Sequence, residues 1–130
     1  MDQYEVGQIL SADLTVENAD EIRDFYASVV GWHTTDMDMG GYSDYFMTSP
    51  DGQPRAGVCH ARGVNAELPP QWIIYVIVED LDKSLEACRV GGGSLIGDVR
   101  GAEQGYRFCI IRDPAGAVMG LMENPPAESG

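Results

Sequence analysis

Apolar and polar residues alternate from Ile9 to Val16, a period of two that is typical of a strand with one buried face. Apolar residues then recur at helical spacing, and Gly31 follows them as a helix end. Asn18, with Glu21 three residues later, has the form of a helix N-cap. The pattern therefore predicts a strand and then an amphipathic helix. The expected apolar face of this helix consists of Ile22, Phe25, Tyr26 and Val29.

The same order of patterns returns about 62 residues later. Val16-Glu17-Asn18 and Val78-Glu79-Asp80 each end an apolar run and precede a helix-like stretch. Tyr45-Phe46-Met47 and Arg107-Phe108-Cys109 are separated by the same interval. Because the matches recur in one order, we infer two copies of one supersecondary unit. Asp80 is the expected cap of the second helix.

Shorter strand candidates follow each helix, separated by turns that contain proline and glycine. Besides 9–16 and 73–78, the expected strands are 32–35, 44–48, 55–61, 94–99, 106–112 and 118–123. The order is strand, helix and three strands, twice. We expect one domain over residues 1–130, built from modules 8–62 and 71–124, with a linker at 63–70 and a flexible tail at 125–130.

The charge balance excludes some classes of partner. The 130 residues carry 8 Lys and Arg against 21 Asp and Glu, a formal net charge of −13 at pH 7. A chain this acidic would repel nucleic acid phosphates and an anionic membrane surface. We therefore expect no nucleic acid and no membrane as partners, whereas a cationic ligand is compatible with the charge.

Cysteine usage and the N-terminal sequence indicate the compartment. The three cysteines are odd in number and have no CxxC spacing, so they predict neither a disulfide framework nor a zinc site. The N-terminus lacks a signal-like apolar stretch, and the longest apolar run, Trp72–Val78, is too short for a membrane helix. A cytoplasmic location is expected.

Three stretches of the chain resemble the vicinal oxygen chelate superfamily, which contains glyoxalases, bleomycin-resistance proteins and extradiol dioxygenases. They are Asp24-Phe25-Tyr26 with Val30-Gly31-Trp32, then Val78-Glu79-Asp80-Leu81-Asp82, and finally Asp113-Pro114-Ala115-Gly116 leading into Val118-Met119-Gly120-Leu121. The resemblance implies an α+β fold in which two βαβββ modules form a curved mixed sheet around a cleft. It also implies a homodimer as the usual assembly.

In metal-dependent members of this superfamily, His or Glu side chains from the first and last strands of each module hold the metal. The matching positions here are Ser11, Gly57, Ile73 and Gly120. Glycine and isoleucine side chains cannot coordinate, and a lone serine hydroxyl is a poor ligand. We therefore predict no metal cofactor. A register slip of one residue would turn His60 or Glu123 inward, so a divalent-metal lyase or dioxygenase is the alternative.

Without a metal, the cleft becomes a site for a small organic molecule, as in proteins of the bleomycin-resistance type. Its expected lining is Asp13, Thr15, Cys59, Tyr75, Ile77 and Met122, with Trp32 and Trp72 at the edges. Asp13 is the sharpest candidate, because a carboxylate within an apolar strand needs a partner, and Arg107 is one possibility. The expected function is binding of a small organic ligand, and a cation held by Asp13 is compatible with the acidic charge. A subunit that serves only protein interaction is a further alternative.

Two other groups of side chains have plain structural interpretations. Cys59 is expected to be an inert buried thiol, because no histidine shares its face of the strand. A series of aspartates is expected to be solvated: Asp20, Asp24, Asp36, Asp38 and Asp44.

Overall fold

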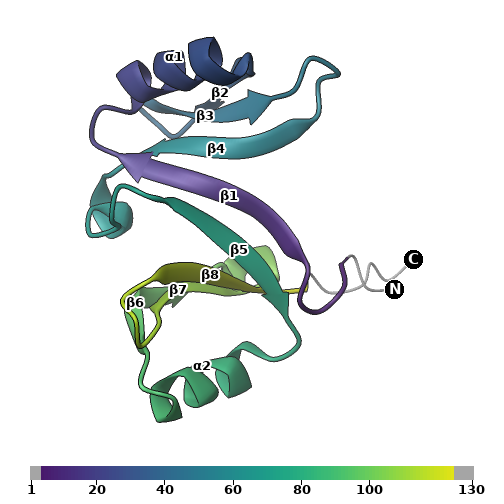
Figure 1. Cartoon of the computed structure of the whole chain (residues 1–130), viewed down its shortest axis with the longest axis vertical. Coiled ribbons are helices and arrows are strands. Elements are labelled where there is room, and N and C mark those ends of the chain that lie inside the picture. Colours follow the sequence, from purple (N-terminus) through teal and green to yellow (C-terminus); the bar gives the residue numbers. More distant parts are fainter. Residues whose placement is uncertain (1–3, 125–130) are drawn as a thin grey trace. The chain divides into compact units, whose positions relative to one another are not determined.

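The computed structural model describes residues 4–124, apart from the side chains of Val64 and Gln104. The predicted flexible tail at 125–130 lies outside the described residues. Two compact units make up the structure (Figure 1). The α1 unit is Ser11–Trp72, and the α2 unit is formed by the described residues of 1–10 and 73–130.

The α1 unit holds one helix and a mixed sheet. Its elements are β1 (Ile9–Val16, from Ser11 onward), α1 (Ala19–Val30), β2 (His33–Asp38), β3 (Ser43–Thr48), β4 (Pro54–His60) and the 3-10 helix η1 (Gly63–Asn65). β4 pairs with β1 in parallel and with β3 antiparallel, and β3 pairs antiparallel with β2. The predicted linker at 63–70 thus contains a short helical turn.

The α2 unit repeats this plan. Its elements are β5 (Trp72–Val78, from Ile73 onward), α2 (Leu81–Val90), β6 (Ser94–Arg100), the 3-10 helix η2 (Ala102–Gln104), β7 (Phe108–Arg112) and β8 (Val118–Glu123). β8 pairs with β5 in parallel and with β7 antiparallel, and β7 pairs with β6. The N-terminal segment joins this unit, because Gly7 N donates to Ile77 O at 2.8 Å and Ile77 N donates to Gln8 O at 2.9 Å.

The predicted α+β fold with two βαβββ modules is confirmed. Strand ends differ from the prediction by a few residues: β2 continues to Asp38, and β7 begins only at Phe108. Such differences are expected, since strand ends depend on pairing partners that the chain does not reveal locally. The bounds of one domain and its linker stay a prediction.

The core of the α1 unit lies between α1 and one face of its sheet. Ala19, Tyr45, Met47, Ala56 and Val58 are buried there, and Ile22, Tyr26, Trp32 and Trp72 pack against them. The helix contacts this core along Ala19, Ile22 and Tyr26, which are spaced by about one turn. Phe25 and Val29 lie outside this contact line and are 54% and 63% exposed, so half of the predicted apolar face is wrong.

The two helices begin differently. The Asp80 side chain accepts a hydrogen bond from Lys83 N at 3.2 Å, which confirms it as the cap of α2. Asn18 makes no such bond, and its amide instead donates to Glu21 Oε2 at 3.1 Å. The reason is local: the Asp80 backbone is extended (φ −141°, ψ 107°), whereas that of Asn18 is not (φ −101°, ψ 50°).

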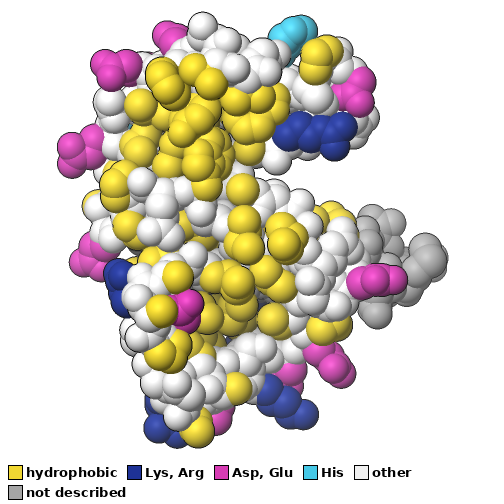
Figure 2. Space-filling model, in the orientation of Figure 1, with side chains coloured by type: hydrophobic (Ala, Val, Ile, Leu, Met, Phe, Trp, Pro, Cys, Tyr) yellow, Lys and Arg dark blue, Asp and Glu magenta, His cyan; other side chains and the backbone are white. Residues whose placement is uncertain are grey.

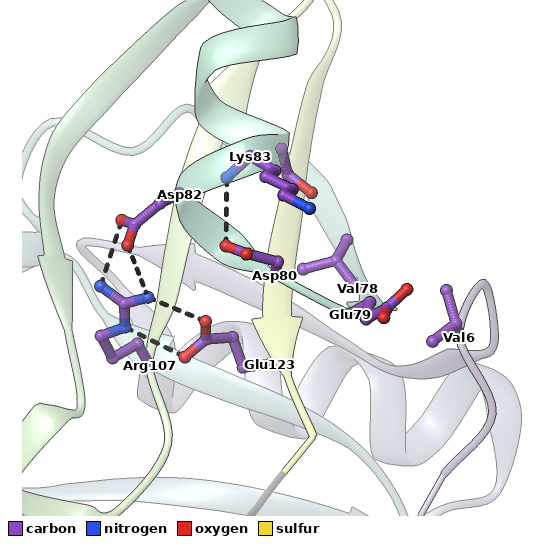
Figure 3. A pocket seen from close by; sticks show the side chains of 9 residues that line it. Val6, Val78, Glu79, Asp80, Asp82, Lys83, Arg107 and Glu123 are labelled. Atoms are coloured by element: carbon purple, nitrogen blue, oxygen red, sulfur yellow. Dashed lines mark hydrogen bonds and ion pairs between the residues drawn. The ribbon is translucent and has the colours of Figure 1, made fainter.

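An ion-pair cluster ties α2 to its sheet. Arg107 donates to Glu123 Oε2 at 2.8 Å and to Asp82 Oδ1 at 3.2 Å, as Figure 3 shows. Glu123 Oε2 also accepts a hydrogen bond from Leu81 N, 3.0 Å away, at the first turn of α2. Arg107 is therefore engaged within its own unit, and the expectation that it pairs with Asp13 is not supported.

This cluster predicts a pH-dependent contribution to stability. Hydrogen bonds from Arg107 lower the pKa of Glu123 from its ordinary value. A carboxylate whose folded-state pKa is lowered stabilises the fold above its unfolded-state pKa, about 4.5, and loses this effect as pH falls through the folded-state value. Glu123→Gln should thus lower Tm at pH 7. The fall in Tm between pH 7 and about pH 3 should be smaller in this variant than in the wild type, because the titrating carboxylate is absent. Differential scanning calorimetry measures both, with Glu79→Gln, at an exposed site, as control; equal acid-induced losses in all three proteins contradict the prediction.

Candidate functional site

Three of the predicted ligand-binding residues share one face of the α1 unit's sheet. Leu14 is buried and Val16 packs on the core beneath α1, so Asp13 and Thr15 project from the opposite face of β1. Asp13 lies across from Gly57 of β4, and Thr15 lies across from Cys59. The structure brings these side chains together as strand alternation predicts, and their role in binding stays a prediction.

Gly57 makes room for the Asp13 carboxyl group. A Cβ built on Gly57 would stand 2.6 Å from Asp13 Oδ1 and 3.2 Å from its Cγ, which is too close for a real side chain. The carboxyl group therefore lies directly against bare backbone. Any larger residue at position 57 would displace it.

The surroundings of Asp13 favour its protonated form. Burial raises the pKa of Asp13, the charge of Asp44 raises it further, and the hydrogen bond from the Gly57 backbone acts in the opposite direction. A cation placed beside Asp13 would favour the ionised carboxylate. The chemistry available on this face is thus cation binding or proton transfer.

The Cys59 thiol is unsuited to nucleophilic chemistry. Burial, with the nearby charges of Asp13 and Asp44, raises the pKa of Cys59 to about 12. The thiolate is the nucleophilic form, so the neutral thiol that prevails at physiological pH is inert. This agrees with the sequence expectation for Cys59.

The sequence did not indicate that Asp44 of β3, with its partner His60 of β4, lies beside this face. Asp44 is only 4% exposed, so its assignment to the solvated aspartates is wrong. It accepts a hydrogen bond from His60 N at 2.8 Å, and the His60 ring Nδ1 lies 3.2 Å from the same oxygen. The pairing of β3 with β4 brings these groups together, and no local pattern reveals that register. The remaining aspartates of the series are exposed, as expected: Asp20, Asp24, Asp36 and Asp38.

The two tryptophans lie on the helix side of the sheet. Trp72 Nε1 donates to Tyr26 OH at 3.2 Å, and the Trp32 and Trp72 rings are 6.0 Å apart in an edge-to-face arrangement. Both pack on the core beneath α1. The structure therefore separates them from Asp13, Thr15 and Cys59 by the thickness of the sheet.

The remaining predicted residues lie in the α2 unit. Tyr75 faces Gly120 across the β5–β8 pair, and Ile77 faces Met122. Phe108 of β7 faces Met122 as well, and its ring lies 6.4 Å from that of Tyr75. These residues form the sheet face opposite α2, because Leu121, the next residue along β8, packs with Leu81 of α2.

In the observed register, Glu123 and His60 each face the helix side of their own unit. Glu123 turns toward α2, where it binds Leu81 N and Arg107. The His60 ring lies between Asp44 and Asp20 of α1, and its Nε2 is 3.4 Å from Asp20 Oδ1. The one-residue slip that would bring a metal ligand inward is therefore not observed.

Three of the four positions matched to metal ligands do not fit a metal. A Cβ on Gly120 would stand 2.3 Å from Tyr75 Cδ1, so an aromatic ring fills the space that a ligand side chain would use. Asp13 fills the same space at Gly57, and Ile73 is apolar and 1% exposed. Within residues 4–124, no group of three or more His, Cys, Asp or Glu is placed to hold a metal ion.

A cavity of about 690 Å³ lies beside the start of α2. Its charged groups satisfy one another in part, through the Arg107 pairs and the Asp80 cap (Figure 3). Elsewhere on the face seen in Figure 2, acidic side chains form separate spots and not one continuous patch. The cavity is lined by Val6, Val78, Glu79, Asp80, Asp82, Lys83, Ser84, Arg107 and Glu123.

None of the helices that the structure describes has the length and apolar character needed to cross a membrane.

Comparisons with known proteins place the chain in a family. CFP32 of Mycobacterium tuberculosis, which is named as a candidate glyoxylase, is 28% identical over 123 residues, covering 93% of this chain and 47% of CFP32. The anthracycline biosynthesis protein DnrV of Streptomyces peucetius is 28% identical over 127 residues, covering 95% of this chain and 45% of DnrV. The chain thus spans about half the length of these relatives.

Solved structures share the fold. Glyoxalase I from Zea mays superposes with a TM-score of 0.62 at 16% identity, over 93% of this chain and 44% of that one. At this identity the likeness shows the fold alone. The model of the Glyoxalase/Bleomycin resistance protein/Dioxygenase superfamily matches residues 7–120. With that match over most of its length, the chain belongs to the Glyoxalase/Bleomycin resistance protein/Dioxygenase superfamily.

Proposed function

We propose that this protein binds a small organic cation through Asp13, on the sheet face of the α1 unit opposite α1, without a metal. The observation that carries the proposal is the Asp13 carboxyl group, half-buried against Gly57, with the buried Asp44 nearby. A partly desolvated carboxylate next to a second one is costly, and a bound cation offsets that cost. Thr15 and Cys59 add polar and weakly polar groups to the same face.

Metal independence is supported by the side chains themselves. Glycine stands at two of the four matched ligand positions, and neighbouring side chains occupy the space beside both. A member of this superfamily with such positions would rely on its own polar groups to recognise a ligand. We also propose a homodimer, because a second copy would cover the edge strands that two small modules leave exposed. A cytoplasmic location is proposed as well, because the three cysteines are free thiols.

The test is isothermal titration calorimetry with two bicyclic aromatic ions of similar size, N-methylquinolinium and 1-naphthoate. The cation should bind at least about tenfold more tightly, a difference of about 1.4 kcal/mol. Equal or tighter binding of the anion would overturn the proposal. Calorimetry is preferred to tryptophan fluorescence, because Trp32 and Trp72 lie on the other side of the sheet from Asp13.

Elemental analysis tests metal independence, and the elution volume in gel filtration tests whether the protein is a dimer. Elemental analysis after incubation with Mn²⁺, Fe²⁺, Ni²⁺ and Zn²⁺ should find less than stoichiometric metal after gel filtration. Stoichiometric retention contradicts metal independence. A dimer that binds neither aromatic ion would instead support the alternative of a subunit that serves only protein interaction.

A further inference from the structure

The buried carboxylate of Asp44 connects the Asp13 face to the helix side of the α1 unit. One oxygen, Oδ1, faces both the backbone N–H and the ring Nδ1 of His60, at 2.8 and 3.2 Å. The Asp44 charge acts on the Cys59 thiol, and the Cys59 sulfur stands 3.7 Å from the Cβ position of Gly57, against which Asp13 lies. Polar groups therefore run from Asp13 through Cys59 and Asp44 to His60.

His60 lies between two carboxylates of different exposure. Asp44 of β3 is buried, whereas the Asp20 side chain of α1, which faces His60 Nε2 at 3.4 Å, is 68% exposed. Tyr45 of β3 donates its hydroxyl to the same Asp20 oxygen. The charged and titratable groups around His60 are Asp44 and Tyr45 of β3, Asp20 of α1, Tyr42 (rings 5.4 Å apart), Arg62 above the Tyr42 ring and Arg23 above the Tyr45 ring.

The corresponding cluster in the α2 unit differs in one respect. By the 62-residue repeat, Tyr45 and Asp20 match Arg107 and Asp82, and Glu123 stands close to the position that matches His60. The α2 cluster is held by arginine, which stays charged at all physiological pH values. Only the α1 cluster contains a histidine, the side chain whose ordinary titration lies nearest neutrality.

We propose that Asp44 and His60 are positioning residues that set the charge of Asp13 and thereby the pH range over which the site accepts a cation. This inference rests on the proposed function, since it concerns the same face. The Asp44 charge opposes ionisation of Asp13, and protonated His60 balances that charge through its Nδ1–H. Asp13 thus ionises more easily when His60 is protonated than when it is neutral.

The decisive experiment follows the Asp13 carboxyl carbon by NMR in the full chain as pH is varied, without ligand. Asp44→Asn removes the opposing charge, so Asp13 should titrate at lower pH than in the wild type. His60→Gln keeps a donor for Asp44 but cannot carry a positive charge, so Asp13 should titrate at higher pH. Opposite shifts are expected only from electrostatics, because loosening of the fold would move both variants toward the unfolded value. Asp36→Asn, at an exposed site in the same unit, should leave the titration unchanged.

Shifts in the same direction, or no shift in His60→Gln, would overturn the inference. If Asp44→Asn does not fold, the sign in His60→Gln alone decides. Opposite NMR shifts with no cation binding would overturn the proposed function and leave the coupling in place. Cation binding with unchanged Asp13 titration would overturn the coupling and leave the function in place.

Discussion

Asp13→Asn is expected to weaken the binding of N-methylquinolinium by about 10-fold to 100-fold, or about 1.4–2.8 kcal/mol, because the cation loses its ion pair with the carboxylate. The substitution keeps the shape of the side chain against Gly57 and removes only its charge. Isothermal titration calorimetry at pH 7 measures the loss. Asp36→Asn, which removes one charge from an exposed site in the same unit, is the control and should bind as the wild type does.

The same substitution should stabilise the protein. Burial and Asp44 raise the pKa of Asp13, so the folded state holds this proton more tightly than the unfolded chain. Ionised Asp13 therefore disfavours folding above its folded-state pKa, and the penalty disappears as pH falls below the ordinary aspartate value of about 3.9. Asp13→Asn should raise the free energy of unfolding by about 1 kcal/mol at pH 7, a typical gain when a destabilising functional group is removed. Near pH 3 it should leave the free energy of unfolding unchanged. Unchanged affinity together with unchanged stability contradicts the assignment of Asp13.

Gly120→Ala is expected to cost about 1–3 kcal/mol of unfolding free energy, the usual range for overpacking a core. The new Cβ would stand 2.3 Å from Tyr75 Cδ1 and 2.5 Å from Cε1. The Tyr75 side chain is only 9% exposed, so its ring cannot swing into solvent without losing its own packing. Urea denaturation monitored by circular dichroism measures the loss.

Gly57→Ala is the matched control for this prediction. Its Cβ would meet Asp13 Oδ1 at 2.6 Å, the end of a side chain that can rotate, so the stability loss should be smaller. Ligand affinity should fall instead, because the Asp13 carboxyl group is displaced. A loss of unfolding free energy below about 0.5 kcal/mol in Gly120→Ala would show that the Tyr75 ring has room to move. Position 120 could then accommodate side chains larger than glycine.

Interpreting the sequence succeeded wherever a short stretch of chain determines its own structure. The alternation from Ile9 to Val16 and the cap at Asp80 depend on neighbours within a few residues, and both are found where expected. The internal repeat is also seen in the strand register, since Asp13 pairs with Gly57 in one unit and Tyr75 pairs with Gly120 in the other. The family and the pairing of elements within each module follow from this order.

Errors arose where contacts over long sequence separations decide burial. Phe25 and Val29 have apolar side chains at helical spacing, yet they lie outside the line along which α1 contacts its core. These outcomes depend on where a helix ends relative to its sheet, which hydrophobic periodicity does not specify.

By itself, the sequence determined that this protein has two βαβββ modules, that Asp13 projects from the face away from the core, and that glycine or isoleucine stands where ligands would be needed. Only the tertiary structure showed that Asp44 is buried, that His60 is its partner 16 residues away on the neighbouring strand, and that Tyr75 fills the space at Gly120. The physical reason is that strand periodicity sets which face a side chain occupies, whereas strand pairing sets which side chain it meets there.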